Sequence, residues 1–227
     1  MSADVDLIHH LGIVTNDFEA LIETYEGLGF VLTPQSVPRI PLRPGGAPEP
    51  LGVGNSCAIF RDNYLELLGV VDRERWASIG PEQRGPFDID RVLHRYEGIH
   101  ILHFGSDDLE HARDRFERQD LNPSPIRPFQ RPVDTAVGIR TMHARSVSFP
   151  AGLMPEALVQ VAQHDTPELV LQPRYMNHPN GAQRISEVII CAEAPDVVAS
   201  RYECPSRTGA QRVCGGFRPR ARISDRT

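Results

Sequence analysis

The sequence contains no lysine, because all 24 of its basic residues are arginine. Without a side-chain amine, enzymes that form a Schiff base through lysine are excluded. We attribute the bias to GC-rich codons rather than to selection for anion binding. The four cysteines show neither a C-x-x-C pair nor the spacing of a zinc site. Reduced thiols in a cytoplasmic protein are therefore expected.

The sequence also lacks an apolar run long enough to cross a membrane. Its first residues include Asp4 and Asp6 and show no secretory pattern, so we expect a cytoplasmic protein with no membrane partner. The formal net charge of -6 argues against nucleic acid as the main partner. A hydrophobic fraction of 40% and a charged fraction of 24% are typical of a globular protein.

The first third of the chain reads as one strand, one helix and three strands. Residues 7–14 predict the first strand, and Asp17 is placed to cap a helix with apolar residues at helical spacing. Further strands are expected at 30–33, 55–61 and 64–71. Between them, "PQSVPRIPLRPGGAPEP" is so rich in Pro and Gly that it predicts a long surface loop.

A second stretch repeats this order about 90 residues later. "GIHILHFGSDDLEHARDRFERQDL" predicts a strand followed by a helix that Asp107 or Asp108 caps. A proline-rich segment follows, and then the strands "RTMHARSVSF" and "ALVQVAQ". A third beginning, strand then helix, is expected in "ISEVIICAEAPDVVASRYE", before a polar, Arg-rich tail.

These patterns predict an α+β chain of paired βαβββ modules. We expect a first module over residues 1–75, a linker with a short helix around 88–96 over 76–97, and a second module over 98–166. A connecting loop over 167–183 and an incomplete third module with a loose tail over 184–227 complete the division.

Several motifs together resemble a known superfamily. They are "HHLGIVTNDFEAL" at 9–21, "GNSCAIFRDNYLELLG" at 54–69, "GIHILHFGSDDLEHA" at 98–112 and "QHDTPELVLQPRYMNHPNGA" at 163–182. With them the chain resembles the vicinal oxygen chelate superfamily and, within it, the glyoxalase-like domain branch, over roughly residues 5–203.

The resemblance implies that two βαβββ modules pair edge to edge, so that their strands curl into one mixed sheet with helices outside. It further implies that first and fourth strands direct His and Glu ligands into a shared cavity. A divalent ion there, Zn, Mn, Fe or Ni, would bind two oxygens of a small substrate as a Lewis acid.

Carried over onto this sequence, the resemblance implies the metal ligands His10, Glu66, His100 and Gln160. His10 stands seven residues before Asp17, as the motif requires. Because neighbours on a strand alternate, His9 is expected to face away from the cavity. Gln160 stands where the pattern has Glu, which lowers the charge of the site.

Alternatives exist at two ligand positions. His103 takes the place of His100 if neither Asp107 nor a bulge restores the spacing, and His164 shares its strand parity with Gln160 and could substitute for it. His143 and Tyr64 are expected to line the cavity. The remaining histidines, His94, His111 and His178, are interpreted as surface residues.

The resemblance leaves three functions open. The preferred one is a metal-dependent lyase or isomerase that acts on a small oxygen-chelating substrate, with Glu66 as the catalytic base. The alternatives are a metal-free protein that binds or sequesters small molecules, and a ring-cleaving dioxygenase. We expect a homodimer in each case.

Overall fold

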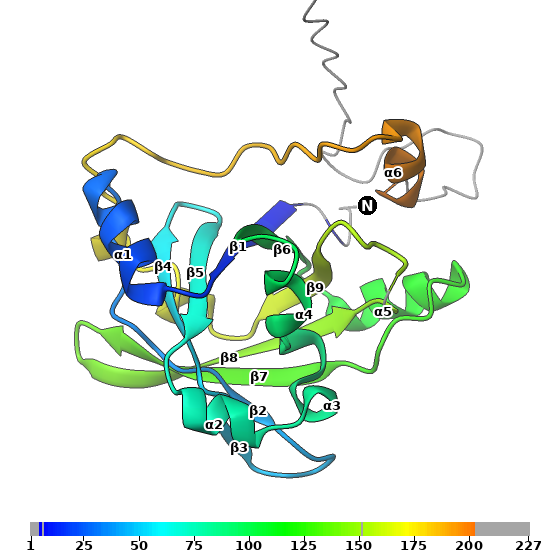
Figure 1. Cartoon of the computed structure of the whole chain (residues 1–227), viewed down its shortest axis with the longest axis horizontal. Coiled ribbons are helices and arrows are strands. Elements are labelled where there is room, and N and C mark those ends of the chain that lie inside the picture. The colour runs from blue at the N-terminus through cyan, green and yellow to red at the C-terminus, as the bar shows by residue number, and fades with distance from the viewer. Residues whose placement is uncertain (1–4, 6, 151, 203–227) are drawn as a thin grey trace, which may run out of the picture.

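A computed structural model describes residues 5, 7–150 and 152–202. One mixed sheet of nine strands, in the order β3-β2-β7-β8-β9-β6-β1-β5-β4, forms its centre (Figure 1). The strands are β1 (Leu7–Thr15), β2 (Arg39–Pro41), β3 (Pro48–Pro50), β4 (Val53–Ile59), β5 (Tyr64–Val70), β6 (Gly98–Gly105), β7 (Arg127–Thr135), β8 (Gly138–Ser148) and β9 (Leu158–His164).

Six α-helices and three short 3₁₀ helices accompany the sheet in the described part of the chain. They are α1 (Phe18–Gly27), α2 (Arg73–Ser78), α3 (Pro81–Arg84), α4 (Asp90–Leu93), α5 (Leu109–Arg118), α6 (Pro195–Tyr202), η1 (Gly85–Phe87), η2 (Pro167–Leu169) and η3 (Pro173–Tyr175). Over the described residues, we find no helix that is both long enough and apolar enough to span a lipid bilayer.

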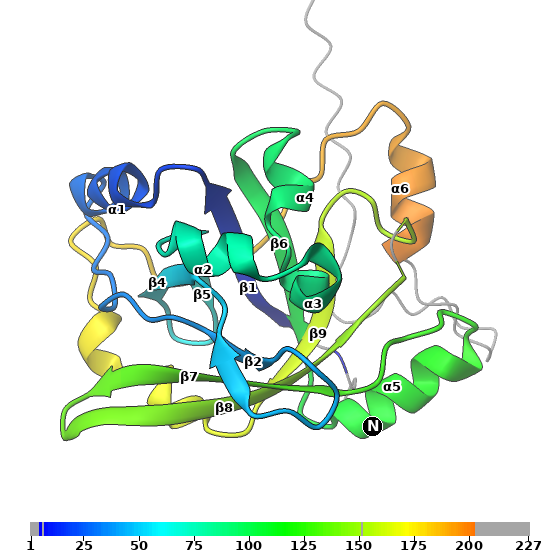
Figure 2. The same ribbon diagram turned by 60° about the horizontal axis from the view of Figure 1, so that its bottom comes forward.

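The sheet consists of two halves that meet at its centre. In the first half β1 pairs in parallel with β5, and in the second β6 pairs in parallel with β9. The halves join where β1 pairs with β6 in antiparallel orientation, and the sheet curls around this seam (Figure 2). The predicted α+β fold, a curled mixed sheet with helices outside, is confirmed.

Each half carries one capped helix on its outer face. The Asp17 carboxylate accepts a hydrogen bond from the amide of Ala20 at 3.0 Å, and the Asp108 carboxylate does the same for His111 at 2.9 Å. Of the two expected caps for α5, Asp108 is therefore the observed one. Behind the caps, Phe18 packs against the outer face of the first half and Phe116 against that of the second.

The proline-rich segment contains structure that the sequence did not predict. Its β2–β3 hairpin attaches to the second half, where Arg39 lies opposite Gln130 of β7. Just before it, Ser36 forms an isolated bridge with Asn55 of β4. The segment therefore links the two outer edges of the sheet and draws the curl toward a barrel. Proline is tolerated there because an edge strand does not need every amide.

The strand expected at residues 30–33 is reduced to a single bridge between Leu32 and Ala58. Residues 73–93, which join the halves, fold into α2, α3, η1 and α4 and cover one end of the curled sheet. There the guanidinium of Arg84 stacks on Trp76 at 3.8 Å and binds Asp88 at 3.1 Å. This brace holds the segment against the interior.

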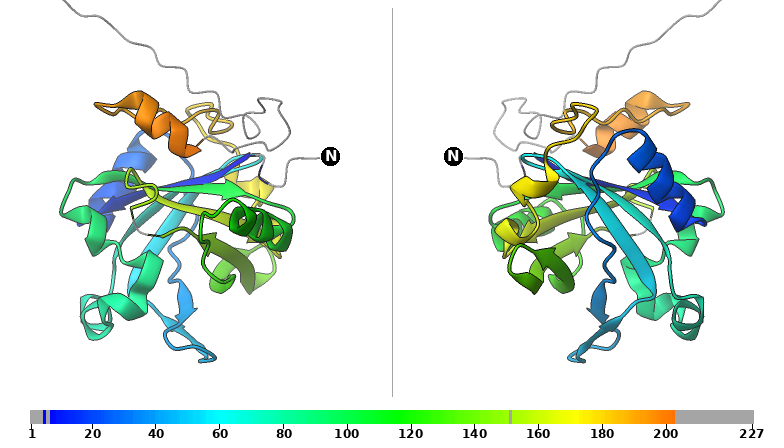
Figure 3. Two further views of the ribbon diagram at one scale, coloured as in Figure 1. Left: turned by 90° about the vertical axis from the view of Figure 1, so that its right-hand side faces the viewer. Right: turned by 90° about the vertical axis from the view of Figure 1, so that its left-hand side faces the viewer.

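The third module's expected first strand is not formed, and this prediction is wrong for residues 185–191. The chain there is extended and exchanges hydrogen bonds with the Asn63 side chain through both backbone groups of Ile185. Both edges of β1 and of β6 are already paired, so the segment lies over the outer face of the sheet instead of joining it (Figure 3). The expected helix is α6, and the Arg-rich tail from 203 onward lies outside the described residues.

Candidate functional site

The inner face of the curled sheet encloses a cavity of about 70 Å³. That is several times the roughly 10–15 Å³ that one water molecule requires, so the cavity suits a small ligand. Its polar wall consists of His9, His10, Tyr64, Glu66, His103, Arg131, Gln160 and His164, with Arg145 and Ser146 nearby. Apolar side chains, among them Leu68, Ile101 and Phe129, complete it.

His10 and His103 form the centre of the polar wall. They lie opposite each other across the β1–β6 seam, and their ring centroids are 4.2 Å apart. Glu66, opposite Gly12 on the adjacent β5, brings its Oε2 to 3.6 Å from Nε2 of His10. Tyr64 stacks on the His10 ring with centroids 4.5 Å apart. The structure thus brings His10, Glu66 and the expected cavity residue Tyr64 together.

His9 also faces the cavity, contrary to the expectation from strand alternation. The register of β1 against β6 shifts between Ile8 and His10, which leaves His9 as the extra residue of a β-bulge. Both neighbouring rings therefore turn inward, and the Nδ1 atoms of His9 and His10 are 2.7 Å apart. At this distance one of the two nitrogens carries a hydrogen and donates a hydrogen bond to the lone pair of the other.

His103, not His100, supplies the imidazole of the second half. A second shift between Gly12 and Ile13 makes His100 the bulged residue of β6. The ring of His100 is buried outside the cavity, where its Nε2 lies 2.7 Å from the carbonyl of Tyr96. The preferred placement of His100 in the cavity is wrong, and the alternative His103 occupies the wall.

Gln160 and His164 both reach the cavity from β9. Gln160 lies opposite His103, and its Oε1 is buried without a hydrogen-bond partner. An unpartnered buried amide oxygen is costly unless a ligand or ion satisfies it. The ring of His164 packs against that of His9, with centroids 4.3 Å apart. The two residues weighed for one ligand position are therefore present together.

A chain of buried hydrogen bonds runs from Arg131 to Glu66. Nη1 of Arg131 donates to Oγ of Ser36 at 3.1 Å, and this hydroxyl donates to Oδ1 of Asn55 at 2.6 Å. Nδ2 of Asn55 then donates to Oε1 of Glu66 at 2.5 Å. A guanidinium can only donate and a carboxylate can only accept, so the direction of the chain is fixed. The chain orients Glu66 and favours its ionised form.

Burial keeps the four imidazoles neutral. It lowers the pKa of His9 to about 4 and that of His103 to about 3. The pKa values of His10 and His164 are also held well below the usual value, by burial and then by charge repulsion from neighbouring histidines and Arg131. These rings consequently offer lone pairs at neutral pH.

Glu66 and Tyr64 shift in the opposite direction. Burial raises the pKa of Glu66, while the charge of Arg131 and the Asn55 hydrogen bond lower it in part. Burial and then the negative charge of Glu66 raise the pKa of Tyr64 well above its usual value. The phenol therefore stays protonated, and Glu66 is a stronger base than an exposed carboxylate.

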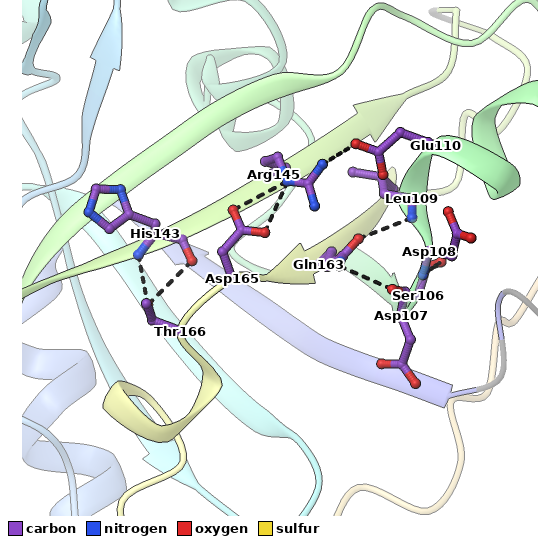
Figure 4. Close-up of polar contacts among 10 residues, drawn as sticks. All are labelled: Ser106, Asp107, Asp108, Leu109, Glu110, His143, Arg145, Gln163, Asp165 and Thr166. Carbon is purple, nitrogen blue, oxygen red and sulfur yellow. Dashed lines mark hydrogen bonds and ion pairs between the residues drawn. The ribbon is translucent and has the colours of Figure 1, made fainter.

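The rim of the cavity is held by ion pairs. Arg145 of β8 donates from Nε to both oxygens of Asp165, at 3.0 and 3.2 Å, and also binds Glu110 of α5 (Figure 4). Figure 4 also shows His143, which is exposed and outside the cavity wall, so the expectation that it lines the cavity is wrong. On β8 the inward positions are instead Met142 and Ala144, both buried.

The donor set suits a divalent ion. Neutral imidazoles, one carboxylate and an amide oxygen without a partner are ligands that Zn, Mn, Fe or Ni accepts. No group of three or more His, Cys, Asp or Glu side chains within the described ranges already has the geometry of a metal site. The residues thus fit an ion in chemistry, and its binding would require their side chains to adjust.

Sequence reasoning missed several residues. Arg131 stands two positions from both Phe129 and Val133, so it shares a face of β7 with them, and these apolar neighbours could have marked it as inward. His178, expected at the surface, is buried: its Nε2 lies 2.9 Å from the carbonyl of Ile59 and its Nδ1 accepts from the amide of Val31 at 3.0 Å. No local sequence pattern indicated that His178 would be buried.

Comparison with one solved structure shows the same fold. A hypothetical protein from Staphylococcus aureus superposes with a TM-score of 0.56 at 14% identity, over 75% of this chain and 64% of that one. Methylmalonyl-CoA epimerases from Streptomyces coelicolor and Mycobacterium tuberculosis align at 19% and 16% identity, with TM-scores of 0.46 and 0.42. Those alignments cover 71% and 72% of this chain and 99% and 90% of the epimerases.

The sequence itself carries the stronger evidence of kinship. No curated protein shows detectable sequence similarity to the chain. The pattern of the glyoxalase-like domain, however, matches residues 8–205, which is most of its length. This match and the paired βαβββ halves confirm the expected superfamily. The chain belongs to the glyoxalase-like domain family of the vicinal oxygen chelate superfamily.

Proposed function

We propose that the protein is a metal-dependent enzyme of the isomerase or lyase type that moves a proton next to a carbonyl of a small oxygen-chelating substrate. The observation that carries the proposal is the convergence of His10, Glu66, His103 and Gln160 on one cavity wall. Three of these donors are neutral, and one of them, Oε1 of Gln160, has no partner in the protein.

In this proposal Glu66 takes the proton from the carbon next to the carbonyl. Burial raises its pKa, and Asn55 fixes one carboxylate oxygen, which leaves Oε2 directed toward His10. The phenol of Tyr64 stays protonated and can donate to a substrate oxygen. A divalent ion held by His10, Glu66, His103 and Gln160 would supply Lewis-acid polarisation of the substrate oxygens.

The test measures metal content and proton exchange together. We expect the purified protein to bind one equivalent of Zn, Mn, Fe or Ni by elemental analysis, and His10→Ala and His103→Ala to lose it. In D₂O, wild type is expected to exchange the protons next to the carbonyl in a panel of small 2-oxo acids, as seen by NMR. Glu66→Gln should slow this exchange at least about 100-fold, since general-base catalysis contributes 10²–10⁴-fold.

His143→Ala is the matched control, because this histidine also stands on a strand but is exposed outside the cavity. It should keep both the metal and the exchange. A wild-type protein that exchanges no proton, or a Glu66→Gln variant that exchanges as fast as wild type, would contradict the proposal.

A metal-free binding protein is the second candidate. The apolar part of the wall, including Leu68, Ile101 and Phe129, favours it, because such surfaces hold small hydrophobic ligands. This candidate predicts tight binding of an aromatic or aliphatic ligand that is unchanged in His10→Ala and produces no proton exchange.

A further inference from the structure

Arg131 places a buried positive charge on the cavity wall. The residue belongs to β7, where it shares the inward face with Phe129 and Val133, and only 4% of its surface is exposed. It lines the same cavity as His10, Glu66 and His164, and its positive charge lowers the pKa of all three groups.

This guanidinium has no carboxylate partner within ion-pair distance among the described residues. Of its five N–H groups, Nη1 donates to Oγ of Ser36 at 3.1 Å and Nη2 lies 3.8 Å from Sγ of Cys57. A thiol is a weak acceptor, and burial raises the pKa of Cys57 to about 12, so it carries no charge at neutral pH. Burying a cation without an anion is costly.

Glu66 makes no direct ion pair with this guanidinium, although the two charges attract each other through the wall. Its Oε1 accepts from Asn55 and its Oε2 lies 3.6 Å from His10, so Ser36 and Asn55 connect it to Arg131 only indirectly. The cation and the carboxylate therefore act at separate points of one wall. Arg145, the other arginine of the cavity, is already bound to Asp165 and Glu110.

We propose that Arg131 binds the carboxylate of the ligand that occupies this cavity. The ligand class is a small carboxylic acid with a second oxygen on the neighbouring carbon, such as a 2-oxo or 2-hydroxy acid. The carboxylate satisfies the free donors of the guanidinium, and the second oxygen points to His10, Glu66 and His103. The cavity of about 70 Å³ offers several times the space that one water molecule requires, which is enough for a small acid of this kind. The choice of acid rests on the proposed function, whereas the carboxylate site does not require a metal.

The test is calorimetric titration of the full chain with pyruvate, its neutral methyl ester and inorganic phosphate. Each titration is made on metal-depleted and on metal-loaded protein. We expect pyruvate to bind at least tenfold more tightly than the ester or phosphate in both forms. Arg131→Gln should weaken pyruvate about 10–100-fold without weakening the ester, which is the effect of losing charged hydrogen bonds. Arg131→Lys should retain part of the affinity, because it keeps the charge but not the planar fork.

Arg127→Gln is the matched control, since Arg127 is an exposed arginine on the same strand. It should bind pyruvate as wild type does. If Arg131→Gln fails to fold, chemical modification of the wild-type protein tests the inference instead. Phenylglyoxal should modify Arg131, as mapped by mass spectrometry, and pyruvate should protect it, whereas the methyl ester should not.

Equal binding of acid and ester, tighter binding of phosphate, or a folded Arg131→Gln variant that binds pyruvate normally would overturn the inference. The metal-depleted protein separates this failure from failure of the proposed function. A protein that takes up no metal but still selects pyruvate through Arg131 would disprove only the metal-dependent enzyme.

Discussion

The two halves of the sheet have the same order of strands and helix, but they place different side chains on the cavity wall. In each half, the residue seven positions before the helix-capping aspartate lies on the inner face: His10 before Asp17, and Ile101 before Asp108. The residue two positions further on lies opposite the fourth-strand ligand position, so that Gly12 faces Glu66 and His103 faces Gln160. The second half has therefore moved its imidazole by one inward position and replaced its carboxylate by an amide.

The site is therefore asymmetric in charge although the fold is nearly symmetric. The first half contributes the carboxylate that we propose as base, together with Asn55, which orients it. The second half contributes the neutral amide of Gln160 and the cation of Arg131. A ligand between them meets a proton acceptor on one side and an anion-binding group on the other.

The largest expected effect is on the pH dependence of stability, and it comes from a feature that both halves share. Each half contributes two buried, neutral imidazoles. The unfolded chain protonates histidine below pH 6.5, whereas the folded chain holds His9 neutral down to about pH 4 and His103 down to about pH 3. The unfolded state binds more protons in this window, so stability is full above pH 6.5 and falls as the pH drops. Each imidazole contributes a slope of about 1.4 kcal/mol per pH unit.

Glu66 opposes this trend, because its raised pKa means that the folded state takes up this proton at a higher pH than the unfolded state does. One carboxylate does not offset the four imidazoles. Urea unfolding at pH 7.5, 6.5, 5.5 and 4.5 measures the slope. His9→Asn from the first half and His103→Asn from the second should each flatten it to a similar extent, and the exposed His143→Asn should not. An unchanged slope in both cavity variants would show that the imidazoles are not held neutral.

A smaller effect is expected at the seam between the halves. A Cβ added at Gly12 would lie 2.7 Å from Cβ of Ile101, at the centre of the sheet, so Gly12→Ala should cost about 1–3 kcal/mol in the free energy of unfolding. At Gly105 the added Cβ would meet the side-chain end of Leu7, which is 39% exposed and free to move. Gly105→Ala should therefore cost less than Gly12→Ala. Chemical denaturation measures the free energy of unfolding of both variants. Equal losses of stability would show that Gly12 is no more tightly packed than Gly105.

The smallest effect comes from restoring symmetry. Gln160→Glu gives the second half the carboxylate of the first, and we expect metal affinity to rise about tenfold, because an added ligand charge strengthens a site for a divalent ion. Gln160→Ala, which removes the amide oxygen, should weaken the affinity for the metal ion instead. Competition with a chelating dye measures both, with His143→Ala as the control. Weaker metal binding in Gln160→Glu would mean that Oε1 does not face the ion.

The sequence was sufficient to predict the repeat and most of its strands and helices, because cap residues and alternation are local. The cap at Asp17, the strand patterns at 55–61 and 64–71, and the strand-then-helix pattern that begins at residue 98 each determine structure within a few residues. Tyr64 and Glu66 lie on the cavity wall as expected, since β5 is regular around them. His10 also lies there, on the regular side of the bulge at His9.

Errors arose where register depends on a partner strand. His9 and His100 are both bulged residues of the β1–β6 seam, and a bulge reverses the side that alternation assigns. The strand expected at 185–191 failed because β1 and β6 already had partners on both edges. No local pattern contains that information.

Local patterns along the chain were enough to establish the two halves, the capped helices and the kinds of side chain that could serve as donors. Which histidines share the cavity depended on long-range strand pairing, because ring direction follows from bulges formed between distant strands. It also joined Arg131 to Glu66 through Ser36 and Asn55, four residues from four separate segments. Such a chain exists only once the curled sheet brings its two edges together, since hydrogen bonds require contact and the sequence separates the groups by up to 95 positions.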